Sequence, residues 1–233
     1  MTDTKEIKST LQKLSAVQRI EWILKKYDLQ RIVLASSFGA EDQVLTHMAV
    51  KVSPEVRIFT LDTGRQFQET YDTFHQTREK YRISIEVYAP SGDDIQALVG
   101  LGGPNTMYES LLKRKECCTI RKIKPLQRVL GTVDAWVCGI RQEQSINRYA
   151  TDVVEWDNVH NIIKFSPIFD WSKNDVWDYI HTNDIPYNRL HDKGFLSIGC
   201  APCTRAVNPG ENERSGRWWW ETSEHNECGL HKR

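Results

Sequence analysis

The sequence lacks the features that define several large protein classes. No apolar run approaches the roughly 20 residues that a membrane-spanning helix needs. Residues 1–26 are mixed in charge and contain no apolar signal-peptide core, so we expect a cytoplasmic protein with no membrane partner. Neither charge is in excess, because 31 Lys and Arg balance 31 Asp and Glu. This balance argues against a general binder of nucleic acid, although it permits a local basic pocket.

Cysteine is also scarce, and its distribution is informative. Six cysteines in 233 residues are too few for a disulfide scaffold, and a chain of this length can bury a core without covalent staples. Cys117 and Cys118 are adjacent, and Cys200 and Cys203 form a C-x-x-C motif. In a reducing compartment, such grouped cysteines indicate metal or redox chemistry. Cys138 stands alone at the end of an apolar run and is most simply a buried small hydrophobe.

Short β-rich runs alternate with helical patterns along the chain. We expect strands at residues 31–35, 56–61, 83–88, 134–138 and, as a strand or sheet edge, 162–168. We expect helices at residues 7–26, 40–51, 66–81, 119–130 and 172–181. This alternation predicts an α/β fold with a mostly parallel sheet covered by helices on both faces.

The regular pattern fades after about residue 190, and the remaining sequence is polar and rich in Gly, Arg and Trp. We therefore predict a single α/β domain over residues 1–210. Residues 211–233 are expected to form a flexible C-terminal tail rather than a second domain.

Polar turns follow the first two predicted strands, at the edge where open α/β sheets bind ligands. Ser36, Ser37 and Gly39 offer hydroxyl and backbone N–H groups at a helix N-terminus, which is a ready anion site, although an ordinary serine-capped turn would look the same. The turn lacks the G-x-x-x-x-G-K-[ST] pattern of a P-loop. Asp62 and Gly64 follow the second strand, where the carboxylate could hold a ribose hydroxyl or a base, but Asp-x-Gly turns are common.

Arginines provide the candidate anion ligands. Arg141 and Arg148 follow the fourth strand and, seven residues apart, would lie on one helical face suited to clamping phosphate or sulfate. The alternative is a solvated polar helix, but the serine turn favours the anion site. Arg214 and Arg217 precede three consecutive tryptophans, which suggests that the arginines enter the pocket while the tryptophans anchor the segment.

The two cysteine pairs leave three interpretations open. Four thiolates suggest a four-sulfur metal site holding zinc or an iron–sulfur cluster. Adjacent cysteines converge poorly on a single ion, whereas a cubane cluster distributes its ligands over separate irons and tolerates their divergence. Arg121 and Lys122 follow the first pair and could offset its negative charge. A redox-active C-x-x-C or inert buried thiols remain the alternatives.

Cys228 lies near the C-terminus beside Gly229, and His231 follows it closely. An accessible cysteine whose pKa is lowered by a neighbouring histidine and by arginines is a candidate thiolate nucleophile. Taken alone, these residues are better interpreted as a frayed chain end that carries an incidental thiol.

Together these motifs, from about residue 30 to the C-terminus, resemble the assimilatory adenylyl-sulfate (APS) reductases. That group belongs to the wider family of APS and phosphoadenylyl-sulfate (PAPS) reductases. The resemblance implies a Rossmann-like, adenine-nucleotide α-hydrolase-like fold, a [4Fe–4S] cluster on the two cysteine pairs, and Cys228 as the catalytic cysteine. The substrate-binding residues expected from the motifs and the resemblance are Ser36, Ser37, Gly39, Asp62, Gly64, Lys122, Arg141, Arg148, Arg214, Arg217 and His231.

The resemblance also implies a mechanism. The Cys228 thiolate attacks the sulfur of APS, AMP leaves, and thioredoxin or a similar dithiol protein releases sulfite from the resulting S-sulfocysteine. We further expect a homo-oligomer.

Three other functions stay open at this point. The first is the same chemistry on PAPS, or on both nucleotides, although PAPS-specific members typically lack both cysteine pairs. The second is an ATP-pyrophosphatase-type sulfurtransferase, whose fuller Ser-Gly-Gly-x-Asp-Ser loop the Ser36–Gly39 turn does not match. The third is a non-enzymatic nucleotide sensor with an iron–sulfur or zinc site.

Overall fold

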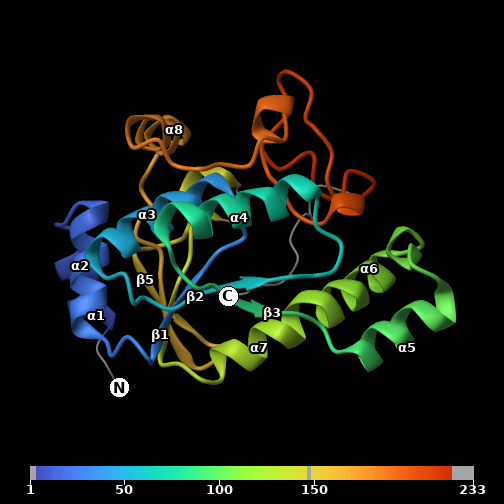
Figure 1. Cartoon of the computed structure of the whole chain (residues 1–233), viewed down its shortest axis with the longest axis horizontal. Coiled ribbons are helices and arrows are strands. Elements are labelled where there is room, and N and C mark those ends of the chain that lie inside the picture. Colours follow the sequence, from blue (N-terminus) through green and yellow to red (C-terminus); the bar gives the residue numbers. More distant parts are fainter. Residues whose placement is uncertain (1–3, 146–147, 222–233) are drawn as a thin grey trace.

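The computed structural model describes residues 4–145 and 148–221, and in this part of the chain six strands form one sheet in the order β3-β2-β1-β4-β6-β5 (Figure 1). All neighbouring strands are parallel except β5 and β6. The strands are β1 (Ile32–Ala35), β2 (Ile58–Leu61), β3 (Glu86–Tyr88), β4 (Ala135–Val137), β5 (Val154–Asp157) and β6 (Ile162–Phe165). The predicted α/β class with a mostly parallel sheet is confirmed.

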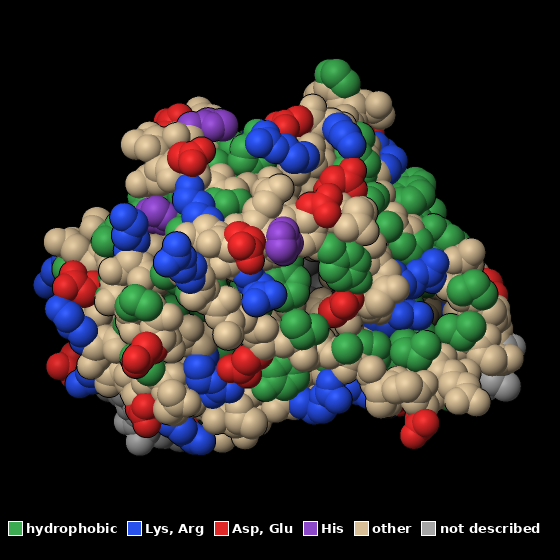
Figure 2. Space-filling model, viewed as in Figure 1, with side chains coloured by type: hydrophobic (Ala, Val, Ile, Leu, Met, Phe, Trp, Pro, Cys, Tyr) green, Lys and Arg blue, Asp and Glu red, His purple; other side chains and the backbone are tan. Residues whose placement is uncertain are grey.

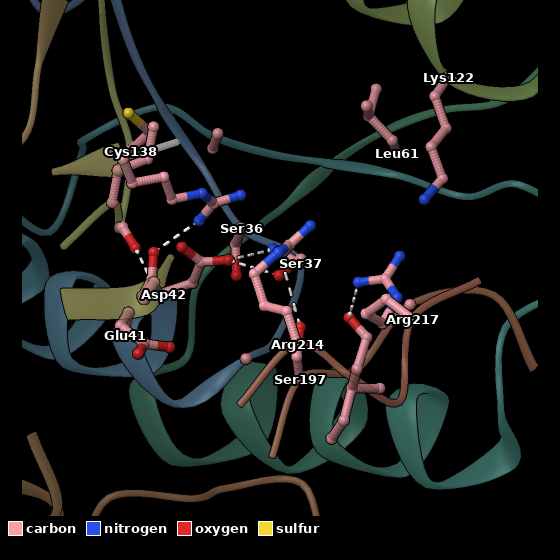
Figure 3. A pocket seen from close by; sticks show the side chains of 18 of the residues that line it. Ser36, Ser37, Glu41, Asp42, Leu61, Lys122, Cys138, Ser197, Arg214 and Arg217 are labelled. Atoms are coloured by element: carbon pink, nitrogen blue, oxygen red, sulfur yellow. Dashed lines mark hydrogen bonds between the residues drawn. The ribbon is translucent and has the colours of Figure 1, made fainter. Parts of the chain in front are cut away.

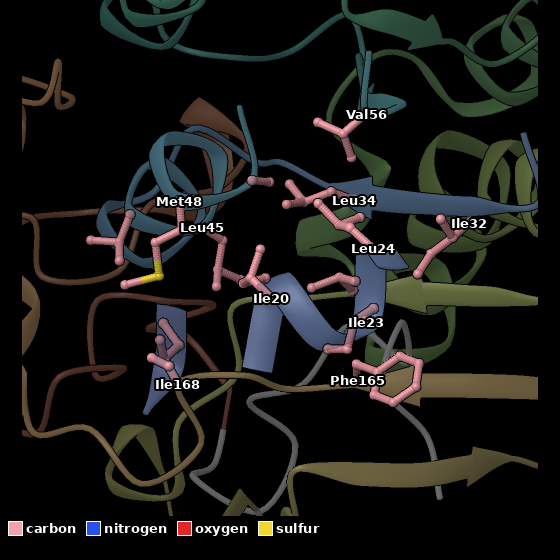
Figure 4. Close-up of a cluster of buried hydrophobic side chains, with 14 of the residues drawn as sticks. Ile20, Ile23, Leu24, Ile32, Leu34, Leu45, Met48, Val56, Phe165 and Ile168 are labelled. Atoms are coloured by element: carbon pink, nitrogen blue, oxygen red, sulfur yellow. The ribbon is translucent and has the colours of Figure 1, made fainter. Parts of the chain in front are cut away.

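Helices cover both faces of the sheet. They are α1 (Thr4–Leu11), α2 (Ala16–Lys26), α3 (Ala40–Val52), α4 (Gln68–Tyr81), α5 (Gly92–Gly102), α6 (Leu111–Cys118), α7 (Lys124–Leu130) and α8 (Lys173–Thr182). Alternate residues of β1 enter two different cores: Ile32 and Leu34 pack with α2 and α3, whereas Val33 packs with α7. Figure 4 shows the larger core, in which Ile20 of α2 lies near Leu45 of α3. This two-sided burial explains why the strands are nearly continuous apolar runs.

The sheet reverses its strand order between β1 and β4. Chain connections from β1 lead towards β2 and β3, and those after β4 lead towards β5 and β6 on the other side. The turns that leave β1 and β4 therefore diverge, and such a switch point leaves a crevice at the carboxyl ends of the strands. In register, Leu34 pairs with Val137, so both strands end at the same level.

Several sequence-based boundaries were wrong for local reasons. The helix predicted over residues 7–26 is two helices, because Ser15 forms a capping box with Gln18 and starts α2 anew. The helix predicted over 119–130 begins as a π-helix (Thr119–Ile123). Helices α5 and α6 and strand β5 were not predicted.

The surface matches the balanced composition. On the face shown in Figure 2, basic and acidic side chains are interspersed. Among the described residues, no helix combines the length and the apolar character needed to cross a membrane.

Candidate functional site

A pocket of about 200 Å³ opens at the switch point of the sheet, and we call it the strand-end pocket (Figure 3). Its walls come from the β1 turn, the β4 turn and the segment 196–217. The predicted site residues that line it are Ser36, Ser37, Gly39, Lys122, Arg148, Arg214 and Arg217. Residues distant in sequence are thus brought to the carboxyl ends of the parallel strands.

The β1 turn is held by a carboxylate. The backbone N–H and the hydroxyl of Ser37 donate hydrogen bonds to Asp42 Oδ2 at 2.7 and 2.6 Å. Phe38 takes the left-handed conformation, with φ of 60°, and stacks on Phe74. The Ser37 N–H, which the sequence suggested for anion binding, therefore donates to Asp42 instead. This hydrogen bond sets the shape of the turn that lines the pocket.

Asp42 also ties the β1 turn to the β4 turn, since the Gly139 N–H donates to its carboxylate. A Cβ atom at residue 139 would lie 2.5 Å from Asp42 Oδ1, so only glycine fits. Burial raises the pKa of Asp42 to about 6, and the charge of Glu41 adds to the rise, while the bonds from Ser37 and Gly139 oppose it.

Four basic residues line the pocket: Lys122, Arg148, Arg214 and Arg217. Lys122 extends into the pocket from the side opposite Arg214 and Arg217 (Figure 3). Arg217 packs so closely on Gly199 that a side chain at residue 199 would overlap its guanidinium, and its Nη1 donates to the Ile198 carbonyl at 3.2 Å. These cations form a place where phosphate or sulfate oxygens can bind.

Arg141 does not line the pocket, and the prediction that it shares a helical face with Arg148 is wrong. A short 3₁₀ turn (Gln142–Gln144) follows Arg141, and Ser145 is extended, so no helix continues from Arg141. Arg141 is 1% exposed and pairs with Glu41 at 2.8 Å and with Glu213 at 3.5 Å. It therefore pairs with two half-buried acids of the pocket wall.

Asp62 and Gly64 are not part of the pocket wall. Asp62 Oδ1 accepts hydrogen bonds from the Gly64 N–H at 2.8 Å and from the Tyr71 hydroxyl at 2.9 Å. Gly64 has φ of 67°, which allows this tight turn. The turn presents the Thr63 carbonyl to Arg121 at 2.6 Å, and so it supports the neighbouring cysteine site.

A second, smaller cavity adjoins the first, and we call it the cysteine cavity. It is lined by the two cysteine pairs Cys117, Cys118, Cys200 and Cys203. Lys122 and Arg217 line both cavities, so the two share a wall. Arg114 and Arg121 also line the cysteine cavity, and these four cations are all buried.

Local backbone geometry brings the two pairs together. Cys117 and Cys118 end α6, and the π-helix that follows turns Arg121 and Lys122 towards the cavity. Short π-helical segments of this kind occur often at functional sites. The C-x-x-C motif forms a 3₁₀ turn (Ala201–Cys203) that is held by the Ala201 N–H donating to the Arg65 carbonyl at 2.8 Å.

The four thiols differ in electrostatic environment. Burial raises the pKa of Cys203 to about 12 and also raises that of Cys117. Burial acts on Cys200 in the same direction, but Lys122, the Thr63 hydroxyl and two arginines outweigh it, and the pKa of Cys200 is lowered. The described cysteines are free thiols. Within residues 4–145 and 148–221, no three His, Cys, Asp or Glu side chains are grouped around one position for a single metal ion.

Sequence reasoning missed several residues of this site. Glu41, Asp42 and Glu213 line the strand-end pocket, and Cys138 also reaches it from β4. Burial raises the pKa of the Cys138 thiol to about 11, which agrees with its predicted role as a buried apolar residue. Cys228 and His231 lie outside the described residues, and their predicted roles stay predictions.

The segment before them packs on the body of the protein. Residues Thr204 and Arg217 form an antiparallel bridge, and the Trp218 N–H donates to the Cys203 carbonyl at 3.1 Å. Trp218 is buried whereas Trp219 is 41% exposed, as expected for consecutive tryptophans. The described part of the predicted tail, residues 211–221, thus contributes to both the strand-end pocket and the cysteine cavity.

Comparison with known proteins gives a consistent result. The phosphoadenosine phosphosulfate reductase domain family matches residues 31–206. The adenosine 5′-phosphosulfate reductase of Allochromatium vinosum is 47% identical over 206 residues, with 88% of this chain and 80% of the relative covered. The enzyme of the same name from Burkholderia cepacia is 43% identical over 228 residues, with 98% and 90% covered.

A solved structure shares the fold. The phosphoadenylyl-sulfate reductase of Candida auris matches with a TM-score of 0.76 and 26% identity over 89% of this chain and 98% of that one. The family match spans the β1 and β4 turns and both cysteine pairs.

Proposed function

The chain belongs to the phosphoadenosine phosphosulfate reductase domain family, and we propose that it reduces adenylyl sulfate to sulfite and AMP. The observation that carries this proposal is the shared wall of the two cavities. Lys122 and Arg217 line both the strand-end pocket and the cysteine cavity. The names of the relatives at 43–47% identity support the same activity.

The charge distribution of the pocket suits this substrate. The cations Lys122, Arg148, Arg214 and Arg217 would receive the phosphate and sulfate oxygens. The acidic side, with Glu41, Asp42 and Glu213, would face hydroxyl or amine donors of the nucleoside. Cations that surround the phosphate oxygen also stabilise the charge that develops on AMP as it leaves.

Cys228 is proposed as the nucleophile. Its thiolate attacks the sulfur atom of the sulfate group, the bond from that sulfur to the bridging oxygen breaks, and AMP departs with the electron pair. The product is an S-sulfocysteine. A dithiol protein, thioredoxin in this proposal, then attacks Sγ of Cys228, sulfite leaves, and the second thiol of the reductant closes a disulfide and regenerates the cysteine.

The donor set fits an iron–sulfur cluster. Four thiols line one cavity, and four buried cations around them would offset the charge of four thiolates. We propose that Cys117, Cys118, Cys200 and Cys203 hold a [4Fe–4S] cluster. Such a group would supply structure and electrostatics beside the sulfate position. Lys122 and Arg217 would orient the sulfate and hold its charge.

The proposal places the protein in the cytoplasm and in sulfate assimilation towards cysteine. The test is an anaerobic assay of the purified protein with APS and reduced thioredoxin, scored for sulfite and AMP. Equimolar sulfite and AMP are expected. No sulfite from APS, together with cleavage of ATP in a parallel incubation, would instead indicate a sulfurtransferase.

One structural observation favours a second substrate. The Candida auris structure that matches this fold is named a phosphoadenylyl-sulfate reductase. Turnover of PAPS is therefore measured beside turnover of APS. A kcat/KM for PAPS equal to or above that for APS would replace the APS-specific proposal with PAPS or dual use.

A further inference from the structure

A buried ion pair joins the last described residue to the helix that carries the first cysteine pair. Arg114 Nε and Nη2 donate to Glu221 Oε1 and Oε2 at 2.9 and 2.7 Å. The two side chains are only 1% and 7% exposed. Arg114 lies on α6, four residues before Cys118, and its guanidinium also interacts with that thiol. One side chain therefore contacts both the cysteine cavity and the end of the segment 214–221.

Trp218 completes this attachment. Its ring contacts two guanidinium groups, with Arg114 Cζ at 4.8 Å and Arg217 Cζ at 4.6 Å from the ring centroid. The backbone of Trp218 has φ of 45°, a conformation that a large side chain adopts only where its surroundings enforce it. The Glu221 N–H donates to the Trp218 carbonyl at 2.8 Å, which closes the turn. Arg217 belongs to the strand-end pocket, so the contacts run without a break from the cysteine cavity to the pocket.

Stability alone is a poor explanation for this pair. Removing two charges from water is costly, and apolar residues of similar size often stabilise a protein as well or better. What a bidentate arginine–carboxylate pair supplies is a fixed direction, because two parallel hydrogen bonds define the orientation of both side chains. At this position, the pair fixes the orientation of Glu221, from which the chain continues towards Cys228 in the sequence.

Sequence distance gives this direction a consequence. Cys228 is seven residues beyond Glu221, so its Cα atom lies within about 25 Å of the attachment point. Positioning of a nucleophile governs its rate steeply, because small displacements move reacting atoms out of line.

We propose that Arg114 and Glu221 are positioning residues for Cys228. The pair fixes the position of Glu221, the last described residue before the segment that carries the nucleophile. This inference rests on the proposed function, in which Cys228 is the nucleophile.

The test uses the full-length protein, purified anaerobically, as wild type, Glu221→Gln and Glu86→Gln. Glu86→Gln is the matched control, because Glu86 accepts the same bidentate contact from Arg57 at 2.8 and 3.1 Å, on an edge strand that is not part of either cavity. Three quantities are measured: the rate of Cys228 S-sulfonation by saturating APS without reductant, the Kd for AMP, and the visible absorbance near 400 nm.

Glu221→Gln is expected to lower the S-sulfonation rate at least fivefold while the Kd for AMP stays within twofold and the absorbance is unchanged. Glu86→Gln is expected to change none of the three. Arg114→Lys, which keeps the charge but loses the bidentate hydrogen bonds, should give an intermediate S-sulfonation rate. Loss of AMP binding or absorbance in proportion to the rate would indicate a merely structural role and overturn the proposal.

A second measurement keeps this inference separate from the proposed function. Cleavage at Glu224 and Glu227 by a glutamate-specific protease reports attachment of the segment without any turnover. Cleavage at least fivefold faster in Glu221→Gln than in Glu86→Gln is expected even if APS is not a substrate. Equal cleavage rates would contradict the proposal that the Arg114–Glu221 pair attaches this segment. Absence of S-sulfonation in the wild type would contradict only the proposed function.

Discussion

The two adjoining cavities of this protein are built in different ways. Two walls of the strand-end pocket are turns that follow strands. Because β1 and β4 are parallel neighbours, Ser36 and Gly139 lie at the same edge of the sheet. The cysteine cavity uses the end of one helix, a π-turn and an irregular segment, and buried arginines hold these parts together. Turns of the sheet therefore contribute most to the strand-end pocket, whereas buried arginines join the separate segments of the cysteine cavity. Lys122 and Arg217 belong to both.

The largest effect should come from a residue that the two cavities share. Lys122→Ala removes a cation from both walls, and loss of one such group from a preorganised site costs about 10²- to 10³-fold in rate. We expect kcat/KM for APS to fall at least 100-fold. Lys124→Ala is the control, because Lys124 is exposed and pairs with Asp94. A Lys122→Ala enzyme within threefold of wild type would contradict the shared-wall account.

The cysteines can be separated by a matched pair of substitutions. Cys200→Ser should remove most of the absorbance near 400 nm and at least half of the bound iron, since a thiolate ligand is lost. Cys138→Ser changes an equally buried thiol that lines only the strand-end pocket, and it should leave both signals unchanged. Iron retained in Cys200→Ser, or lost equally in Cys138→Ser, would contradict the proposed ligand set.

The strand-end pocket should be disturbed by the addition of a single methyl group at residue 139. Gly139→Ala places a Cβ against Asp42 and Glu41, and overpacking of this kind costs about 1–3 kcal/mol. We expect that loss in the free energy of unfolding in urea, together with weaker AMP binding. Gly92→Ala is the control, because a Cβ there meets open space, and it should not destabilise the protein. A neutral Gly139→Ala would show that the two turns are not packed as described.

The smallest effect is a pH dependence. The pKa of Asp42 is raised to about 6 in the folded protein and is near its ordinary value of 3.8 when unfolded. The folded state therefore binds the proton more tightly, and the stability contributed by this group is lost as pH rises through 6. Between pH 5 and 7.5 the wild type should lose about 1 kcal/mol relative to Asp42→Asn. Urea unfolding at both pH values measures this difference. A constant difference between the two proteins would show that Asp42 does not titrate in this range.

The same contrast between the cavities explains what could be predicted from the sequence. Strands β1, β2 and β4 are short apolar runs buried on both faces, so local composition was sufficient to find them. Their polar turns were then placed correctly at the carboxyl ends of the sheet. Helix α5 was missed because it contains several glycines, and α6 because half of its residues are charged. Strand β5 carries two acidic residues and only a short apolar pattern.

Long-range contacts account for the errors within the site. Arg141 was predicted to reach the anion, but its partner Glu41 is 100 residues away in the sequence, and nothing local indicates that pairing. The Arg114–Glu221 pair spans 107 residues and was not predicted for the same reason. Arg214 and Arg217 line the strand-end pocket, and they precede tryptophans; a segment with buried aromatics is expected to pack on the body of the protein.

The central claim is that the two cavities serve one transfer of the sulfonate group to Cys228. Its most direct test is an anaerobic incubation with APS labelled with ³⁵S, without any reductant, followed by peptide mapping. The account predicts one AMP released per label bound, with the label on Cys228 and its release as sulfite when reduced thioredoxin is added. AMP release with label absent from Cys228, or sulfite formed by Cys228→Ser, would contradict it.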